Sequence, residues 1–238
     1  FGSPVFHWAL ALLMIVIGLG QLTRSEGLMG VPEKEIVLDT AESYGVLTEG
    51  PWFTGHSGYG IGITEFERYY NDGTVDRGAS PVVTLYDGDL ALVSQRIYPN
   101  QPLRYEAMMI HMSEWGYAPE VGSTTAAGES LGSLKMIMDV EEGMPRSTTS
   151  GFDITSPTDG STLEFSAALI AHEDGPQLEL VGSDLNGAEV SRAQLGVGEE
   201  LTLPNGDRVE YRELHYYARL SVVHDWSVSF IYLLFILG

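Results

Sequence analysis

The sequence predicts a mainly β protein, in which an antiparallel β-sandwich or layered β-domain is bracketed by transmembrane α-helices. Both ends of the chain are apolar, whereas the roughly 200 residues between them are rich in Gly, Thr, Ser, Val, Leu and acids, enough for one sizeable core or two small ones. In that middle part, short apolar runs and turn signals alternate about every ten residues, which favours antiparallel strands over βαβ units. A helical period is not evident outside the two ends.

These features divide the chain into four segments. We expect a transmembrane helix at 1–24, a juxtamembrane connector at 25–60, a β-domain at 61–223 and the start of a second transmembrane helix at 224–238. Within the β-domain, the stretch 143–162 is thick with Gly, Pro, Ser and Thr. It predicts a loop or a boundary between two β-layers.

The first apolar end, residues 5–22, carries no formal charge. As a helix with a rise of about 1.5 Å per residue it covers roughly 27 Å, close to the ~30 Å of a bilayer's hydrocarbon core. We therefore expect a membrane-spanning helix. A secretory signal peptide is the alternative, but this run is longer than an h-region and lacks a basic n-region and an A-x-A cleavage pattern.

The second apolar end, residues 226–238, is too short to span a bilayer by itself. We expect the beginning of a second helix, so that the sequence is part of a longer polypeptide. The alternative is a buried strand of a soluble domain. Two helices that bracket one domain must enter and leave it on the same side of the membrane.

The formal net charge is -21, with only two lysines, Lys34 and Lys135. A chain without a basic face cannot release counterions from phosphate, so we expect no nucleic-acid partner. The acidic surface suits either a basic partner or general adaptation to salt or acid. The chain has no cysteine, which excludes disulfides, thiolate metal sites and a C-x-x-C redox pair. We find no phosphate-binding loop, nucleophile elbow or H-E-x-x-H motif, and hence no enzyme signature.

Turn residues separate the strands of the predicted β-domain. Asn71, Asp72 and Gly73 tolerate the positive φ that tight hairpins need, and 87–89 and 204–207 have similar composition. Pro99 and Pro102 lack amide donors, so 96–102 is predicted to be a rigid corner or an edge. The connector contains aromatic residues at 52, 53 and 59, which suit either a loop near the lipid headgroups or packing against the domain. The predicted strands are 35–39, 61–70, 82–86, 90–93, 103–112, 163–171, 177–181, 201–203, 209–211 and 214–223.

Three stretches resemble one protein family. The first turns at Asn71, Asp72 and Gly73 and continues to an N-x-P-L-x-Y corner formed by Asn100, Pro102, Leu103 and Tyr105. The second runs from 198 to 232 and carries Asp225 at the start of its apolar end, and the third is the first helix with His7 near its start. Together they resemble the ResB family of cytochrome c biogenesis proteins. Lys34 and Glu106 depart from the family pattern, in which Gly is common at these places.

The resemblance implies a function in haem delivery. It implies that the chain works with a CcsA-type membrane protein, which handles haem through a Trp-rich segment that this sequence lacks. The pair moves haem across the plasma or thylakoid membrane and presents it to the C-x-x-C-H motif of apocytochrome c. The β-domain then faces the extracytoplasmic or lumenal side, and the chain is at most part of a cytochrome c synthase complex.

His7 is the residue that we expect to bind the cofactor. An ionisable residue inside a membrane helix is costly, and imidazole is a common axial ligand of haem iron. The resemblance implies that His7 ligates a transient haem b, with the other axial ligand on the partner. The alternative is that His7, close to Pro4 and Trp8, is a wetted interfacial residue.

The other histidines give weaker signals. His224 precedes the second apolar end and is expected to be a boundary residue or a second, outer site. If His7 lies at the far end of its helix, the two histidines are separated by nearly the hydrocarbon thickness of ~30 Å, so they cannot share one iron. We expect His56, His111, His172 and His215 to be core or surface residues. Methionines of the β-domain are expected to fill gaps in the core.

Two other functional classes remain open at this stage. One is a ResB-like accessory subunit of a larger respiratory or photosynthetic membrane redox complex, without haem of its own. The other is a soluble, secreted β-sandwich that acts as a binding module.

Overall fold

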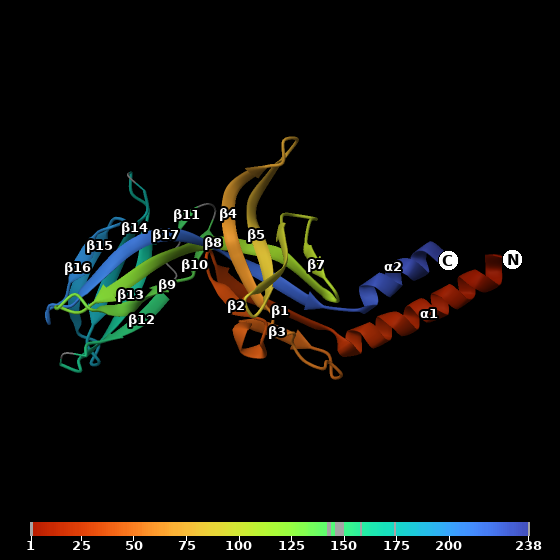
Figure 1. The fold of residues 1–238 in the computed structure, drawn as a ribbon, viewed down its shortest axis with the longest axis horizontal. Helices are drawn as coiled ribbons and strands as arrows, with labels where there is room; N and C mark the ends of the chain where they lie inside the picture. The colour runs from red at the N-terminus through yellow and green to blue at the C-terminus, as the bar shows by residue number, and fades with distance from the viewer. Residues whose placement is uncertain (1, 142–143, 146–149, 158, 174, 238) are drawn as a thin grey trace. The chain divides into compact units, whose positions relative to one another are not determined.

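The computed structural model describes residues 2–141, 144–145, 150–157, 159–173 and 175–237 (Figure 1). It divides into two compact units. The first unit consists of Phe1–Glu114 with Ala218–Gly238, and the second of Trp115–Tyr217. The long strands β8 (Met108–Thr124) and β17 (Arg208–His224) contribute residues to both units. Strands dominate the chain and pair antiparallel in the hairpins and sheets, which confirms the mainly β prediction.

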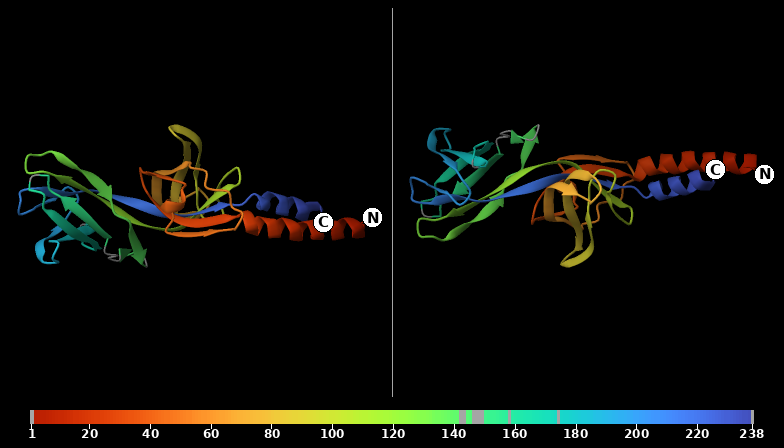
Figure 2. Two further views of the ribbon diagram at one scale, coloured as in Figure 1. Left: turned by 90° about the horizontal axis from the view of Figure 1, so that it is seen from below. Right: turned by 90° about the horizontal axis from the view of Figure 1, so that it is seen from above.

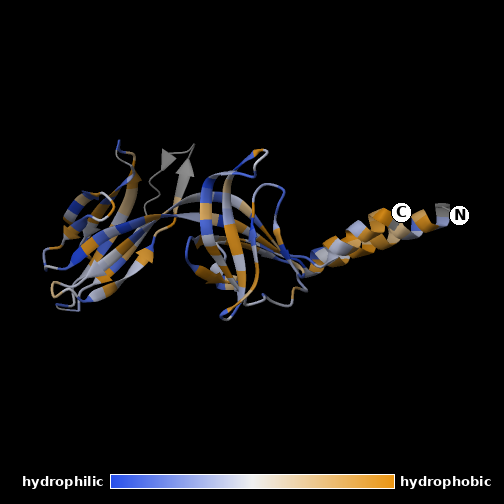
Figure 3. Ribbon diagram, turned by 45° about the horizontal axis from the view of Figure 1, so that its top comes forward, coloured by the Kyte–Doolittle hydropathy of each residue, from blue (hydrophilic) through white to orange (hydrophobic). Residues whose placement is uncertain are grey.

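Two helices belong to the first unit. They are α1 (Gly2–Thr23) and α2 (Ser227–Leu237), which lie side by side in all three views of Figures 1 and 2. Figure 3 shows both as almost continuously hydrophobic. Among the described residues, only the helical stretch Pro4–Thr23 is long and apolar enough to cross a membrane, whereas α2 is shorter. The apolar tail is therefore a helix and not the alternative strand.

The two helices meet through small residues on one face of α1. Ala9 and Gly20 are buried, and the face between them continues through Leu13. Leu13 and Ala9 line an apolar groove with Leu234 of α2. Gly20 lies directly against Ser227, and a Cβ atom at Gly20 would come within 2.3 Å of the Ser227 Oγ. Close approach of this kind requires a residue without a side chain, as at many membrane helix contacts.

The first unit contains two groups of strands. In one, β2 (Ile36–Leu38), β4 (Gly60–Asn71), β5 (Asp76–Asp87) and β6 (Leu90–Arg96) form a sheet in that order. In the other, β1 (Ser25–Pro32) pairs with β17 and with β3 (Val46–Glu49), and β7 (Leu103–Tyr105) pairs with β8. A single 3-10 turn, η1 (Ala41–Ser43), precedes β3. The core side chains of this unit include Met29, Val31, Ile61, Ile63, Val83, Leu85, Ile97, Leu103 and Ile110.

The predicted turns of the first unit are confirmed. Gly73 has a φ of 91°, and its amide donates to the Asn71 side chain at 2.8 Å. Asp72 accepts hydrogen bonds from the next turn residues and pairs with Arg77. The predicted corner at 96–102 is a turn closed by Tyr98 and Gln101, with Asn100 at a φ of 66°.

The predicted strand 103–112 is wrong, because the chain reverses direction within it. Tyr105 pairs with Met108, and the two residues between them form a tight hairpin with Glu106 at a φ of 51°. Two-residue hairpins need positive φ, which Glu adopts at a cost. Lys34 also has a positive φ, 63°. Lys34 and Glu106, the two residues that replace a glycine common in the family, therefore both have a left-handed backbone conformation.

The second unit contains a four-stranded sheet in the order β12 (Ser150–Thr155), β13 (Thr162–Ile170), β14 (Gln177–Ser183) and β15 (Glu189–Leu195). Its other strands are β9 (Ser130–Lys135), β10 (Met138–Glu141), β11 (Met144–Pro145) and β16 (Glu200–Thr202), with parts of β8 and β17. Side chains from both groups share one core that includes Tyr117, Met138, Phe165, Leu180, Val209 and Tyr211. The unit is thus layered.

Part of the predicted loop at 143–162 lies outside the described residues, at 143, 146–149 and 158. The described remainder does not form a simple loop. Residues 150–155 form β12, which pairs along its whole length with β13. Of the small and hydroxylated residues that suggested a loop, Ser150, Gly151 and Thr155 lie on this edge strand, whereas Ser156, Gly160 and Ser161 form the turn that follows it.

Substituting the glycine at the helix contact should loosen the pair α1–α2. Gly20→Ala places a Cβ atom 2.7 Å from the Ser227 Cβ, and we expect it to lower the free energy of unfolding by about 1–3 kcal/mol. Gly18→Ala is the matched control, because no atom lies within 4 Å of its new Cβ and Ala favours the helix. Thermal unfolding of the detergent-solubilised chain measures both. Equal melting temperatures of the two variants would contradict the close packing.

Restoring glycine at the left-handed hairpin position should stabilise the protein. We expect Glu106→Gly to raise the free energy of unfolding by about 1 kcal/mol, because it relieves a positive φ. Gln194→Gly is the control, because Gln194 is an exposed residue of β15 with a negative φ. We expect this substitution to lower the free energy of unfolding by about 0.5–1 kcal/mol. A loss of stability in both variants would refute the hairpin geometry.

Candidate functional site

The first unit buries one carboxylate completely. Asp39 follows β2, and its side chain has no exposed surface. One oxygen, Oδ1, accepts a hydrogen bond from the Tyr44 hydroxyl at 2.6 Å, and Oδ2 accepts from the Ser57 amide at 2.8 Å and from the Ser57 hydroxyl at 2.6 Å. Donors from both ends of one loop thus converge on this carboxylate.

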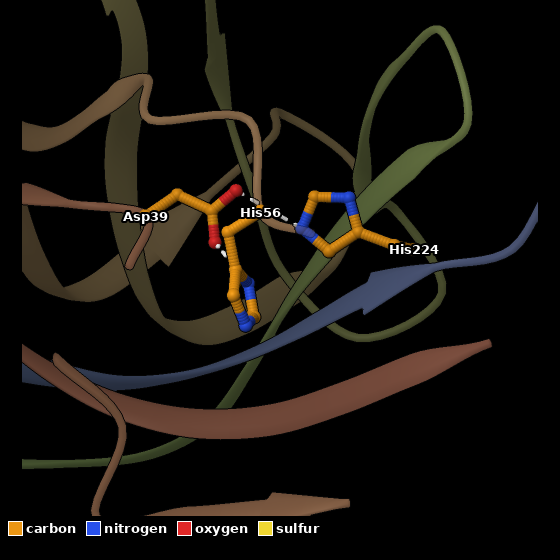
Figure 4. Close-up of side chains that lie close together, drawn as sticks. All are labelled: Asp39, His56 and His224. Atoms are coloured by element: carbon orange, nitrogen blue, oxygen red, sulfur yellow. Dashed lines mark hydrogen bonds and ion pairs between the residues drawn. The ribbon is translucent and has the colours of Figure 1, made fainter. Parts of the chain in front are cut away.

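Two imidazole rings complete the cluster (Figure 4). His56 Nδ1 lies 3.0 Å from Asp39 Oδ1, and its other nitrogen, Nε2, lies 3.0 Å from Glu49 Oε1. His224, at the end of β17, places its Nε2 3.1 Å from Asp39 Oδ2, close enough for an ion pair but without the direction of a good hydrogen bond. The His56 and His224 side chains are 9% and 14% exposed. We call Asp39, His56 and His224 the triad.

Aromatic rings surround the triad. Phe53 lies 5.2 Å from the His56 ring and 5.9 Å from the His224 ring, and Tyr44 stacks obliquely on His56 at 5.2 Å, measured between ring centroids. The two imidazoles face each other edge to face at 5.8 Å. Phe53 therefore packs against the domain, in agreement with that alternative for the connector aromatics, whereas Trp52 is exposed.

Backbone hydrogen bonds hold the connector, which carries Asp39 and His56. The Gly50 and Trp52 amides donate to the Arg24 and Leu22 carbonyls, and so satisfy groups that the end of α1 leaves without partners. A Cβ atom at Gly50 would lie 2.4 Å from the Leu22 carbonyl oxygen. The Asp39 amide and carbonyl pair with Tyr59 and Gly58. The connector is thereby fixed to the end of α1.

The surroundings perturb two of these groups. Burial alone raises the pKa of Asp39, but the His224 imidazole and the hydrogen bonds from Ser57 and Tyr44 outweigh it and hold the pKa far below its ordinary value. Burial, together with the hydrogen bond to Asp39, raises the pKa of Tyr44 well above its ordinary value. Asp39 is therefore a permanent anion inside the fold at neutral pH.

The triad has the composition of a metal site. One donor atom from each of its three residues lies within 4.8 Å of the others. A second such group, Glu120, Glu213 and His215, lies in the second unit, where His215 Nε2 is 3.2 Å from Glu120 and 3.3 Å from Glu213. Sequence reasoning missed both groups, because their residues have no regular spacing. It treated His56 as an isolated core or surface residue and favoured a boundary role for His224.

His7, the predicted haem ligand, lies elsewhere. It is exposed in the first quarter of α1, with its ring 5.7 Å from Phe6. Two residues, or roughly 200° of helix rotation, separate it from Ala9, which packs toward α2. His7 therefore lies on the face of α1 opposite to α2. Seventeen residues separate it from the connector, so it is roughly 25 Å along the helix axis from the triad's end of α1.

The family of the chain follows from its match to a model of a known protein family. The model of the ResB-like family matches residues 1–203. The chain belongs to the ResB-like family. This membership indicates a role in cytochrome c biogenesis in general, and together with α1 it indicates membrane association. A search of curated proteins found no match.

The residues that carry the ResB-like motifs shape the backbone. Gln95 donates to the Pro102 carbonyl at 3.0 Å, Leu103 is fully buried, and the Tyr105 ring contacts Tyr59 at 5.9 Å. Asp225 accepts from the Ser227 amide and hydroxyl at the start of α2, while its own amide donates to Ala107 of the β7–β8 hairpin. These contacts are structural and give the corner and the helix start their geometry.

Removing the buried charge should destabilise this ResB-like protein in a pH-dependent way. We expect Asp39→Asn to lower the free energy of unfolding by about 3 kcal/mol at pH 7, because it removes the buried carboxylate that accepts the hydrogen bonds of Tyr44 and Ser57. The pKa of Asp39 is lower in the folded protein than in the unfolded chain. The wild type therefore has the full stabilisation above about pH 4 and loses it progressively as the pH falls toward the folded-state pKa. The difference between the two proteins should therefore shrink in acid.

Thermal unfolding with a chelator present, from pH 7 down to pH 3, measures this difference. Asp89→Asn, at an exposed hairpin turn, is the control and should follow the wild type. A difference between Asp39→Asn and the wild type that stays constant over this range would refute the assignment of Asp39 as a buried anion.

Proposed function

We propose that this ResB-like protein assists haem transport across the membrane and its delivery to apocytochrome c, with His7 as one axial ligand of the haem iron. Family membership supports the general role. The observation that carries the specific role is the position of His7, an ionisable residue exposed on an otherwise apolar membrane helix. Such residues are expensive in lipid and are functional candidates by default.

The orientation of His7 supports a ligand shared with a partner. His7 is exposed, and its face of α1 points away from α2, where we propose that another membrane protein docks. The sequence of α1 contains no second histidine and that of α2 contains none, while the triad lies roughly 25 Å away. We propose that the second axial nitrogen comes from a CcsA-type haem-handling protein.

Haem is the cargo in this proposal and is held only transiently. When bound, the iron supplies an axial site that a neutral imidazole fills. His7 contributes that nitrogen, and the surrounding apolar residues of α1 exclude water from the macrocycle. Release from this chain would then require the bond between His7 and the iron to break. The β-domain, which we propose to lie on the extracytoplasmic or lumenal side, positions the partner and the apocytochrome.

Removing the imidazole should weaken or alter haem binding without affecting the fold. We expect the complex of His7→Gly with its CcsA-type partner to lose or shift its Soret band, and added imidazole to restore it, because free imidazole fills the vacated ligand position. His172→Ala, at an exposed histidine of the second unit, is the matched control and should keep the wild-type spectrum.

Absorption spectra of the purified complexes, together with holocytochrome c formation in cells, measure this effect. An unchanged Soret band in His7→Gly would exclude His7 as the ligand. If the wild-type chain instead co-purified stoichiometrically with a redox complex and carried no haem, the accessory-subunit alternative would replace this proposal.

A further inference from the structure

We propose that the triad of Asp39, His56 and His224 binds a divalent transition-metal ion of the zinc class. This site is distinct from the haem ligand at His7, and it does not depend on the proposed haem transport. It joins the connector, which supplies Asp39 and His56, to the last residue of β17, which supplies His224.

The donor atoms already have nearly the spacing that an ion needs. Nitrogen and oxygen ligands lie about 2.1 Å from zinc, so two ligands of a tetrahedral site are about 3.4 Å apart. In the structure, each imidazole nitrogen lies 3.0 or 3.1 Å from its Asp39 oxygen, and all three donor atoms fall within 4.8 Å. The two carboxylate–imidazole distances are thus a few tenths of an ångström shorter than this spacing, and no pair of donor atoms exceeds it by more than about 1.4 Å.

The residues that contact the triad are of the types that usually hold metal ligands in place. A metal-bound histidine usually donates its second ring nitrogen to a carboxylate, and His56 Nε2 faces Glu49 at 3.0 Å. Tyr44 and Ser57 hold the Asp39 carboxylate in place, which is the role of outer hydrogen bonds on a ligating acid. Glu49, Tyr44 and Ser57 are therefore positioning residues.

The charge balance favours a cation. Asp39 is a fully buried anion, and the ion pairs that reach it among the described residues come from histidines, not from lysine or arginine. The buried His224 Nε2 has no hydrogen bond of good direction. A dication would offset the charge of the buried carboxylate and would take the His224 Nε2 as a ligand.

The ligand types select the class of metal. Two imidazoles and one carboxylate suit zinc, iron, cobalt, nickel or copper, whereas calcium and magnesium prefer oxygen ligands throughout. Three protein ligands leave one tetrahedral position for water or an incoming group. The group of Glu120, Glu213 and His215 is a weaker candidate, because it has one imidazole and the Glu213 side chain is 56% exposed.

Titration with Zn²⁺ tests the proposal. The full chain, purified in detergent without a histidine tag and stripped with a chelator, should bind one Zn²⁺ ion and melt at a higher temperature when loaded. We expect His224→Ala and His56→Ala to weaken binding on the order of 100-fold or more, and Glu49→Gln by roughly 10- to 100-fold. His172→Ala should bind as the wild type does.

The Co²⁺ spectrum provides a second readout that needs no variant. Bound Co²⁺ should give the intense visible bands of a low-coordinate nitrogen and oxygen site, and these bands should disappear when Zn²⁺ is added. Absence of these bands in the wild type, or full Zn²⁺ affinity in a folded His224→Ala variant, would overturn the proposal. His7→Gly should keep Zn²⁺ binding unchanged, so failure of this site and failure of the haem proposal are distinguishable.

Discussion

The buried carboxylate of Asp39 is the constraint around which the membrane-proximal part of the first unit is built. A carboxylate removed from water costs several kcal/mol unless donors replace its hydration. Here the donors come from Tyr44 and Ser57, with two imidazoles beside them, and they draw together the connector and the end of β17. The same loop satisfies the last carbonyls of α1. One electrostatic requirement therefore fixes the place where the chain leaves the apolar helix and becomes a β-domain.

The two kinds of histidine near the membrane are suited to different tasks. His7 is exposed on the face of α1 away from α2. His56 and His224 are enclosed by Phe53 and Tyr44 and have their partners within the first unit. An open imidazole suits transient ligation of a cargo, whereas enclosed imidazoles suit a permanent structural or metal-binding role. The two proposals thus concern separate residues and separate parts of the unit.

The residues that carry the ResB-like resemblance act mainly on the backbone. The turn at Asn71, Asp72 and Gly73 closes a hairpin, and the corner from Asn100 to Tyr105 leads into a second hairpin whose left-handed residue is Glu106. Asp225 connects that second hairpin to the start of α2. A family motif made of turns and a helix start identifies the fold, but it does not locate a chemical site.

Local chemistry in the sequence was enough to predict the long apolar helix, the mainly β character and the turns, because hydrophobic length, Pro and Gly act within a few residues. It also singled out His7, since an ionisable residue in an apolar helix is visible without a structure. The hairpin at Glu106 and the strand at 150–155 were missed because pairing with a neighbouring strand overrode the local pattern. The triad was decided by tertiary structure alone: Asp39, His56 and His224 are distant in sequence, and only the folding of the connector against β17 places their donor atoms within reach of one ion.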